Sequence, residues 1–167
     1  MFTLKLLHKE GIPAALSKAE RYRLLNEPSE AESICLDVLA VEPDNQHALI
    51  TLLLSLTDQF EHGIADRQAR ALALVPRLAG EYERIYYAGL IRERRGKAAL
   101  DDGGTLVAGS DIYEWLTEAM ELYEQAEALS APGNDEARLR YNACARKLNS
   151  NPALRPREEA ESAPYHD

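Results

Sequence analysis

Histidines are the first residues to consider for chemistry, because imidazole acts both as a metal ligand and as a general base near neutral pH. The chain has four, at His8, His47, His62 and His166. No two of them stand one helical turn apart, so the HExxH arrangement of a zinc site is missing from the sequence. Glu61 and His62 could form an acid–base pair, but such polar neighbours are common by chance in turns between helices. The histidines therefore predict neither catalysis nor a metal site.

A segment with three glycines at residues 101–110 stands among acidic residues and could in principle hold a cation or a phosphate. The carboxylates are those of Asp101, Asp102 and Asp111. Calcium loops alternate their acidic ligands and end in glutamate, and this segment does neither. The pair Gly103-Gly104 lacks the spacing and the lysine of a phosphate-binding loop. We therefore expect a connecting loop here, and no cofactor.

Cys35 and Cys144 are the two cysteines of the chain, and neither belongs to a CxxC motif or a Cys/His cluster. Both stand in segments with helical periodicity, where a cysteine of this kind typically packs as a small core residue. A disulfide between them is the alternative that the spacing leaves open. We expect two buried, reduced thiols and a cytoplasmic protein.

One basic cluster stands out, made of Arg92, Arg94, Arg95 and Lys97. It falls at the predicted end of a helix, where cations interact favourably with the helix dipole. In an antiparallel hairpin it would face the acidic residues of the following helix, which are Glu114, Glu118 and Glu121. Runs of charge are more often paired or solvated faces than anion sites, so we expect structural ion pairs. Trp115, close by, is expected to pack rather than to bind a ligand.

The composition limits the classes of partner. The 167 residues are 46% hydrophobic and 28% charged, which is ordinary for a globular chain. The net charge of −9 would repel phosphates, so we expect no nucleic-acid or membrane partner. No stretch approaches the roughly 18 apolar residues that a bilayer-spanning helix needs.

Helical periodicity dominates the chain, and strand patterns are nearly absent, so the sequence predicts an all-α fold. Helices are expected at about residues 13–26, 29–42, 46–60, 64–74, 81–97, 111–130 and 134–149. Ser29 with Glu32, and Asp111 with Glu114, are predicted to form capping boxes at two helix starts. Asp44 or Asn45 is expected to cap the helix that begins at residue 46.

The prolines that end pairs of predicted helices recur at a regular spacing. Pro43 and Pro76 lie 33 residues apart, and each closes a pair of helices. Two units share a similar spacing of residues in the second helix before the closing proline. The first unit has Ala31, Cys35, Val38 and Pro43, and the third has Ala119, Tyr123, Ala126 and Pro132. Small alanines let two helices of a hairpin approach closely, and a large residue fills the space between hairpins. A single hairpin cannot bury its apolar face, so about three units are needed.

In this pattern the chain resembles the tetratricopeptide repeat (TPR) family. The resemblance implies an α-α superhelix of about three hairpins and a C-terminal capping helix over residues 12–149. Residues 1–11 are then an N-terminal apolar segment, and residues 150–167 are predicted to be a disordered tail.

In TPR proteins the first helices of the hairpins line a concave groove, so the resemblance implies a groove here. Its candidate residues are Leu16, Glu20, Arg23, His47, Ile50, Leu54, Asp58, Arg84, Ala88, Ile91, Arg138 and Asn142. These do not reproduce the lysine/asparagine clamp with which some family members grip a C-terminal carboxylate. Ile50 and Leu54 lie on a helix that is apolar on every side, so they either line an open groove or are core. The apolar residues Phe2, Leu4, Leu6 and Leu7 could cover them.

The sequence thus favours a non-catalytic protein-interaction module that binds an extended peptide or a partner helix in this groove. Two alternatives remain within the same architecture. One is a dedicated chaperone for an aggregation-prone or secreted partner. The other is a structural subunit that associates with its own copies, its groove filled by another copy's N-terminal segment. The identity of a partner is not encoded in any motif of the chain.

Overall fold

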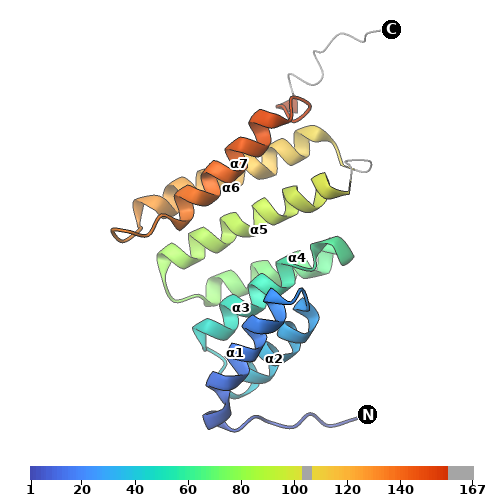
Figure 1. Cartoon of the computed structure of the whole chain (residues 1–167), viewed down its shortest axis with the longest axis vertical. Coiled ribbons are helices and arrows are strands. Elements are labelled where there is room, and N and C mark those ends of the chain that lie inside the picture. Colours follow the sequence, from blue (N-terminus) through green and yellow to red (C-terminus); the bar gives the residue numbers. More distant parts are fainter. Residues whose placement is uncertain (103–106, 158–167) are drawn as a thin grey trace. The chain divides into compact units, whose positions relative to one another are not determined.

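The computed structural model describes residues 1–102 and 107–157. In these residues the secondary structure is entirely helical, with seven α-helices and three short 3-10 turns and no strand. The α-helices are α1 Ile12–Leu24, α2 Pro28–Val41, α3 Gln46–Thr57, α4 Ile64–Leu74, α5 Glu81–Asp101, α6 Gly109–Ala128 and α7 Glu136–Ser150 (Figure 1). The predicted all-α class is confirmed, and packed helical hairpins are the units from which α-α superhelices are built.

The chain divides into two compact units, residues 1–79 and residues 80–167. Unit 1 holds α1 to α4, and each helix packs against the next along the chain. Helix α1 also contacts α3, so these two first helices of successive hairpins lie together. Ala19 on α1 and Ala31 on α2 are both fully buried, which is how small side chains let the first hairpin close. Cys35 is a fully buried free thiol in the same region, as expected.

Unit 2 is built on the long pairing of α5 with α6, and α7 packs on α6. Two glycines of α5 face α6 at very short range. A β-carbon on Gly89 would lie 3.1 Å from Cε1 of Tyr123, and one on Gly96 would lie 3.1 Å from Cδ2 of Leu116. Glycine therefore sets how closely these two helices approach. Cys144 on α7 is the second fully buried free thiol, which confirms the prediction for both cysteines.

Residues 151–157 follow α7 and pack back on unit 2. Leu154 is only 8% exposed and belongs to the hydrophobic cluster of this unit. Arg157 donates a hydrogen bond of 2.8 Å to Oδ1 of Asp111 on α6. The rest of the predicted tail, residues 158–167, lies outside the described residues, as do residues 103–106 of the predicted loop.

Several helix ends differ from the sequence-based expectation. Both predicted capping boxes are wrong, because α2 begins at Pro28 and α6 begins at Gly109, which puts Ser29 and Asp111 inside the first turn. Asn45 is the cap of α3, as predicted, and its side chain accepts a hydrogen bond of 2.9 Å from the amide of Ala48. Helix α3 ends at Thr57 because the chain then turns into a 3-10 turn at Phe60–His62. Helix α5 continues to Asp101, four residues beyond the expected end.

Candidate functional site

The predicted groove residues of unit 1 come from α1 and α3, and the structure brings four of them together in two polar pairs. Oε1 of Glu20 and Nε2 of His47 are 2.6 Å apart. Nε of Arg23 donates a hydrogen bond of 2.8 Å to Oδ2 of Asp58. Each pair joins α1 to α3, so the two first helices are cross-linked by polar contacts on this face.

These pairs flank a strip of aliphatic side chains. Residues 47, 50, 54 and 58 are spaced by three or four positions, so they share one face of α3. Ile50 and Leu54 therefore lie between His47 at one end and Asp58 at the other, and both are half-buried. A half-buried aliphatic strip with polar groups at each end can accept an apolar anchor and fix its orientation.

A cleft of about 440 Å³ opens at the His47 end of this strip. Its lining comes from the turn before α1, from α1 itself and from the start of α3, and consists of Lys9, Ile12, Pro13, Leu16, Glu42, Asn45 and His47. Leu16 is 6% exposed and packs with Ile12 and Val38, so it forms the floor of the cleft as part of the core. Two of the predicted groove residues, Leu16 and His47, thus meet at one cavity.

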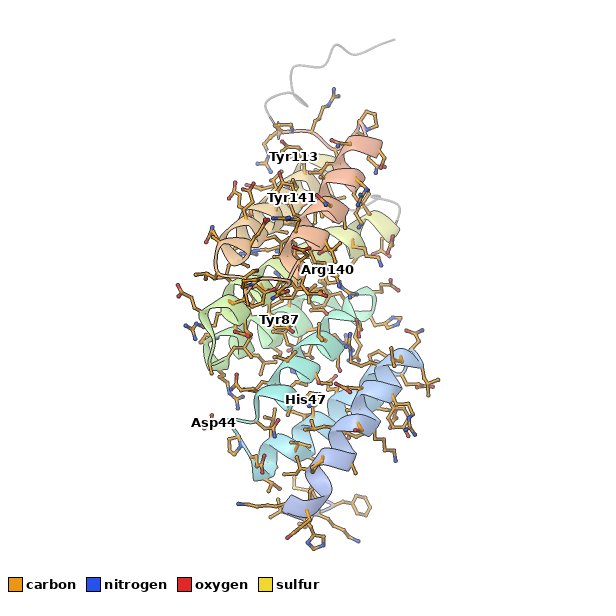
Figure 2. The ribbon with its side chains drawn as sticks, turned by 60° about the vertical axis from the view of Figure 1, so that its left-hand side comes forward. Asp44, His47, Tyr87, Tyr113, Arg140 and Tyr141 are labelled. Carbon is orange, nitrogen blue, oxygen red and sulfur yellow. The ribbon has the colours of Figure 1, made fainter. Side chains whose placement is uncertain are left out.

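The sequence explains why His47 points into this cleft. Asn45 caps α3, and its own amide group donates a hydrogen bond of 2.9 Å to Oε2 of Glu42. This double contact fixes the first turn of α3, because a capping side chain replaces the missing backbone partner of an early amide. His47 lies in that first turn, 48% exposed, and Figure 2 shows it on the surface of unit 1.

One of the two pairs at this site, Glu20–His47, is exposed enough to exchange its contact for one with a ligand. Glu20 and His47 are both about half-exposed. Ion pairs in such surroundings contribute at most about 1 kcal/mol to stability, because water screens them. Glu20 and His47 can therefore turn to a ligand at little energetic loss, whereas the pair of Arg23 and Asp58 is more buried.

The predicted groove residues of unit 2 are spread over different surroundings. On α5, Ile91 is fully buried, whereas Arg84 and Ala88 are half-buried. On α7, Arg138 turns to α6, where its Nε donates a hydrogen bond of 2.9 Å to Glu127. Asn142 on α7 is exposed.

The polar centre of unit 2 is a buried network that sequence reasoning missed. Glu93 on α5 is 2% exposed, and its Oε2 accepts a hydrogen bond of 2.6 Å from the hydroxyl of Tyr123 on α6. Its other oxygen lies 3.6 Å from Nη1 of Arg140 on α7. The three helices of this unit are therefore tied by one carboxylate. The sequence indicates this network only weakly. Helix α7 carries arginine at both 138 and 140, and the spacing does not show which of the two faces Glu93.

A group of tyrosines surrounds this network. The rings of Tyr82 and Tyr86 stack with centroids 5.6 Å apart, and Tyr87 meets Tyr86 edge-on at 5.0 Å. Tyr86 also lies 5.7 Å from Tyr123. Figure 2 labels Tyr87 on α5 and Arg140 on α7 of this unit.

Burial shifts the titration of these groups. It raises the pKa of Tyr123, and the neighbouring carboxylate of Glu93 raises it further. Burial raises the pKa of Tyr87 to about 12 and that of the Cys144 thiol to about 12. Burial opposes the charge of Arg140, but attraction to Glu93 and the interactions with Tyr86 and Tyr123 together outweigh it, so the pKa of the guanidinium is raised. At neutral pH the phenols and the thiol are therefore neutral while Arg140 is charged.

Two residues of the basic cluster near the end of α5 make contacts with α6, and one of these contacts is an ion pair of the expected kind. Nε of Arg92 lies 3.1 Å from Oε2 of Glu118 on α6. The guanidinium of Arg95 stands over the ring of Trp115, 3.9 Å from its centroid. A cation over an indole face is attracted by the ring's quadrupole, so this contact also joins α5 to α6.

The other residues considered for chemistry are dispersed. Glu61 and His62 are both exposed in the turn before α4. Within residues 1–102 and 107–157, no three His, Cys, Asp or Glu side chains are grouped so that they could hold a metal ion. Over the same residues, none of the helices is long and apolar enough to cross a membrane.

In comparisons with known proteins, no protein-family model, no curated protein and no solved structure matches this chain.

Proposed function

We propose that this chain is a non-catalytic interaction module, in which the α1–α3 face of unit 1 binds an extended peptide or a helix of a protein partner. The observation that carries the proposal is the aliphatic strip of Ile50 and Leu54, flanked by the pairs Glu20–His47 and Arg23–Asp58. Apolar anchors from the ligand would pack on the strip. The flanking groups would provide donors and acceptors for its backbone and polar side chains.

A non-catalytic role is supported by the state of the two thiols. Burial raises the pKa of both Cys35 and Cys144 to about 12, so each thiol is protonated at neutral pH. The thiolate is the nucleophilic form of cysteine, so neither residue is poised for covalent catalysis. Two buried, unpaired thiols also suit a reducing compartment, and we place the protein in the cytoplasm on that ground.

Peptide selection tests the proposal directly. A displayed library of random peptides would be selected on the full chain, and the enriched peptides measured by fluorescence anisotropy. We expect Ile50→Glu/Leu54→Glu to bind them at least about ten-fold more weakly, because a charge on the strip opposes apolar anchors. Leu36→Glu/Leu72→Glu is the matched control, since both leucines are exposed on the second helices α2 and α4 of the same unit.

Circular dichroism would show first that each variant folds. If the Glu substitutions unfold unit 1, Ile50→Ser/Leu54→Ser removes the aliphatic strip without adding charge and replaces them in the comparison. Equal affinity of the wild type and the folded strip variant would overturn the proposal, and so would an equal loss in the control.

The N-terminal residues favour a second candidate function, which is self-association. Met1, Phe2, Leu4 and Leu6 are exposed by 74% or more. Exposed large apolar side chains in one segment are typical of a contact that is made with another surface. Sedimentation equilibrium of the full chain and of Phe2→Ser/Leu4→Ser/Leu6→Ser tests this candidate. A mass that halves in the variant supports it, and a monomeric wild type excludes it.

A further inference from the structure

A second surface of unit 1 lies on the outer side of α1, opposite the core. Its residues are spaced by three or four positions and are Ala14, Ser17, Lys18, Arg21, Tyr22 and Leu25. They line a hollow of about 520 Å³. The opposite side of the helix carries the buried residues Ile12, Leu16 and Ala19. The outer face therefore does not take part in the packing of α1 on α2 and α3.

This face mixes apolar contact area with positive charge. Leu25 is 64% exposed at its end, and the ammonium of Lys18 stands 5.7 Å from the centroid of the Tyr22 ring. Neither Lys18 nor Arg21 has an acidic partner among the residues that the structure describes. Arg23, on the inner side of the same helix, is paired with Asp58.

The charge of this end of the chain is opposite to that of the rest. Residues 1–25 contain five Lys or Arg and two Glu, which leaves a net charge of +3. The whole chain carries −9, so residues 26–167 carry −12. Two cations beside an apolar hollow, in a chain rich in carboxylates, are complementary to an acidic ligand.

We propose that the outer face of α1 binds an acidic amphipathic helix of a partner protein. From residue 14 to residue 25 the face extends about 16 Å along the helix axis, which is the length of about three turns. Ala14 and Ser17 are small and permit a second helix to approach closely, while Tyr22 and Leu25 offer apolar contact area. Carboxylates along the edge of the partner helix would then meet Lys18 and Arg21.

Charge disfavours a second copy of α1 and the chain's own N-terminal segment as occupants of this face. Two copies of α1 packed on each other through this face would bring Lys18 and Arg21 against their own counterparts. The N-terminal segment carries Lys5 and Lys9, so it has the same sign as the face. Like charges at an interface oppose association, so neither a second α1 nor the N-terminal segment fits this face, whereas an acidic helix does.

The test uses the full chain and a defined probe. The probe is a fluorescein-labelled peptide of about five helical turns, with leucines at helical spacing along one side and glutamates on both flanks. A second peptide has lysines in place of the glutamates, and a third has the probe's composition in an order that destroys the amphipathic pattern. Binding would be measured by fluorescence anisotropy at two salt concentrations, since screening weakens attraction between charges.

We expect the chain to bind the acidic helix and to bind both other peptides at least about ten-fold more weakly. Lys18→Glu/Arg21→Glu should weaken binding at least about ten-fold and reverse its salt dependence, because the new carboxylates repel the glutamates of the probe and salt screens that repulsion. Lys97→Glu/Arg146→Glu is the matched control, because it makes the same charge change at two exposed cations of unit 2. Tyr22→Ser/Leu25→Ser should also weaken binding, without removing the salt dependence.

Three results would overturn the proposal. One is equal affinity for the acidic and the lysine peptide, and another is unchanged binding in Lys18→Glu/Arg21→Glu. The third is co-sedimentation of the chain with phosphatidylserine/phosphatidylcholine vesicles that the same variant abolishes, with no peptide binding, which would assign the face to a membrane surface. The outcome is separate from that of the proposed function, because Ile50 and Leu54 lie on α3, away from this outer face.

Discussion

The hydroxyl of Tyr123 donates a hydrogen bond of 2.6 Å to Oε2 of Glu93, and the two side chains are 0% and 2% exposed. A buried carboxylate is tolerated only where hydrogen bonds and opposite charge replace its water shell. Arg140 supplies the charge at 3.6 Å from the other oxygen. One carboxylate thus meets all three helices of unit 2, and any change in their packing would leave it without a partner.

Removal of the Tyr123 hydroxyl should therefore destabilise unit 2. Tyr123→Phe leaves Oε2 of Glu93 buried without its donor, so we expect a loss of about 1–3 kcal/mol in the free energy of unfolding. Urea unfolding followed by far-UV circular dichroism measures it. Tyr113→Phe on the same helix is the control, because the Tyr113 hydroxyl makes no hydrogen bond among the described residues.

A double-mutant cycle separates the hydrogen bond from general packing. Glu93→Leu/Tyr123→Phe removes both polar groups, so we expect it to be less destabilised than the sum of the two single variants. Additive losses would show that the two side chains do not interact, and a Tyr123→Phe loss equal to that of Tyr113→Phe would show the same.

The close approach of α5 and α6 predicts different responses at two glycines. Alanine normally stabilises a helix relative to glycine by about 1 kcal/mol. At Gly89 a β-carbon would lie 3.2 Å from Cβ of Leu122 and 3.1 Å from the Tyr123 ring, which its hydrogen bond holds in place. At Gly96 the contacts are Cδ2 and Cγ of Leu116, both at 3.1 Å, and no β-carbon or hydrogen-bonded ring lies as close.

Gly89→Ala should accordingly lower the free energy of unfolding by about 1 kcal/mol or more, since an overpacked core shifts rigid neighbours. Gly96→Ala should change it by less, because no hydrogen bond holds the Leu116 side chain and it can shift by a few tenths of an ångström. Thermal and urea unfolding of both variants make the comparison. A Gly89→Ala variant as stable as the wild type, or more stable, contradicts the expected rigidity of Tyr123.

The helices were predictable because the spacing of their apolar residues and the glycines and prolines between them indicate the same helix boundaries. Helix α4 has the expected bounds, since Gly63 precedes it in a left-handed conformation at φ 118° and Pro76 follows in a 3-10 turn. Helix starts were predicted less well, because serine and aspartate favour caps only when they stand just outside the helix. Pro28 takes the first position of α2 and so moves Ser29 inside it.

This difference yields a paired prediction at two helix starts. Asn45→Ala should destabilise unit 1 by about 1 kcal/mol, because the amide of Ala48 loses its acceptor. Ser29→Ala should leave stability nearly unchanged, because the side chain of Ser29 does not cap α2. Urea unfolding of the two variants under the same conditions checks both. If Ser29→Ala lowered the free energy of unfolding as much as Asn45→Ala, the side chain of Ser29 would cap α2 after all.

The candidate site was predictable in unit 1 and much less so in unit 2. In α3 the spacing from His47 to Asp58 defines a single face, so the sequence could place these two residues together, but their pairing with Glu20 and Arg23 of α1 was not predicted. In α7 cations stand at 138, 140, 146 and 147, so hydrophobic periodicity does not define the inner face. Glu93 was missed for a related reason, since a carboxylate in a charged helix is expected at the surface.

The buried phenols and thiols should make the free energy of unfolding decrease at alkaline pH. Burial raises the pKa of Cys35, Cys144 and Tyr87 to about 12 each, and it raises the pKa of Tyr86 and Tyr123 as well. In the unfolded chain a thiol ionises near pH 8.5 and a phenol near pH 10, as is typical of exposed groups. Between those values and pH 12 the unfolded state has lost protons that the folded state keeps. Stability is therefore complete below about pH 8 and falls as the pH rises.

Each of these groups can contribute a slope of up to about 1.4 kcal/mol per pH unit once its unfolded form ionises. We expect the free energy of unfolding, measured in urea from about pH 7 to pH 11, to decline from near pH 9 and more steeply above pH 10. Cys35→Ala/Cys144→Ala should delay the decline to the phenol range, because no thiol remains to ionise. A free energy of unfolding that stays flat to pH 11 would mean that these side chains are hydrated in the folded protein. Such hydration would contradict the packing of both units at their centres.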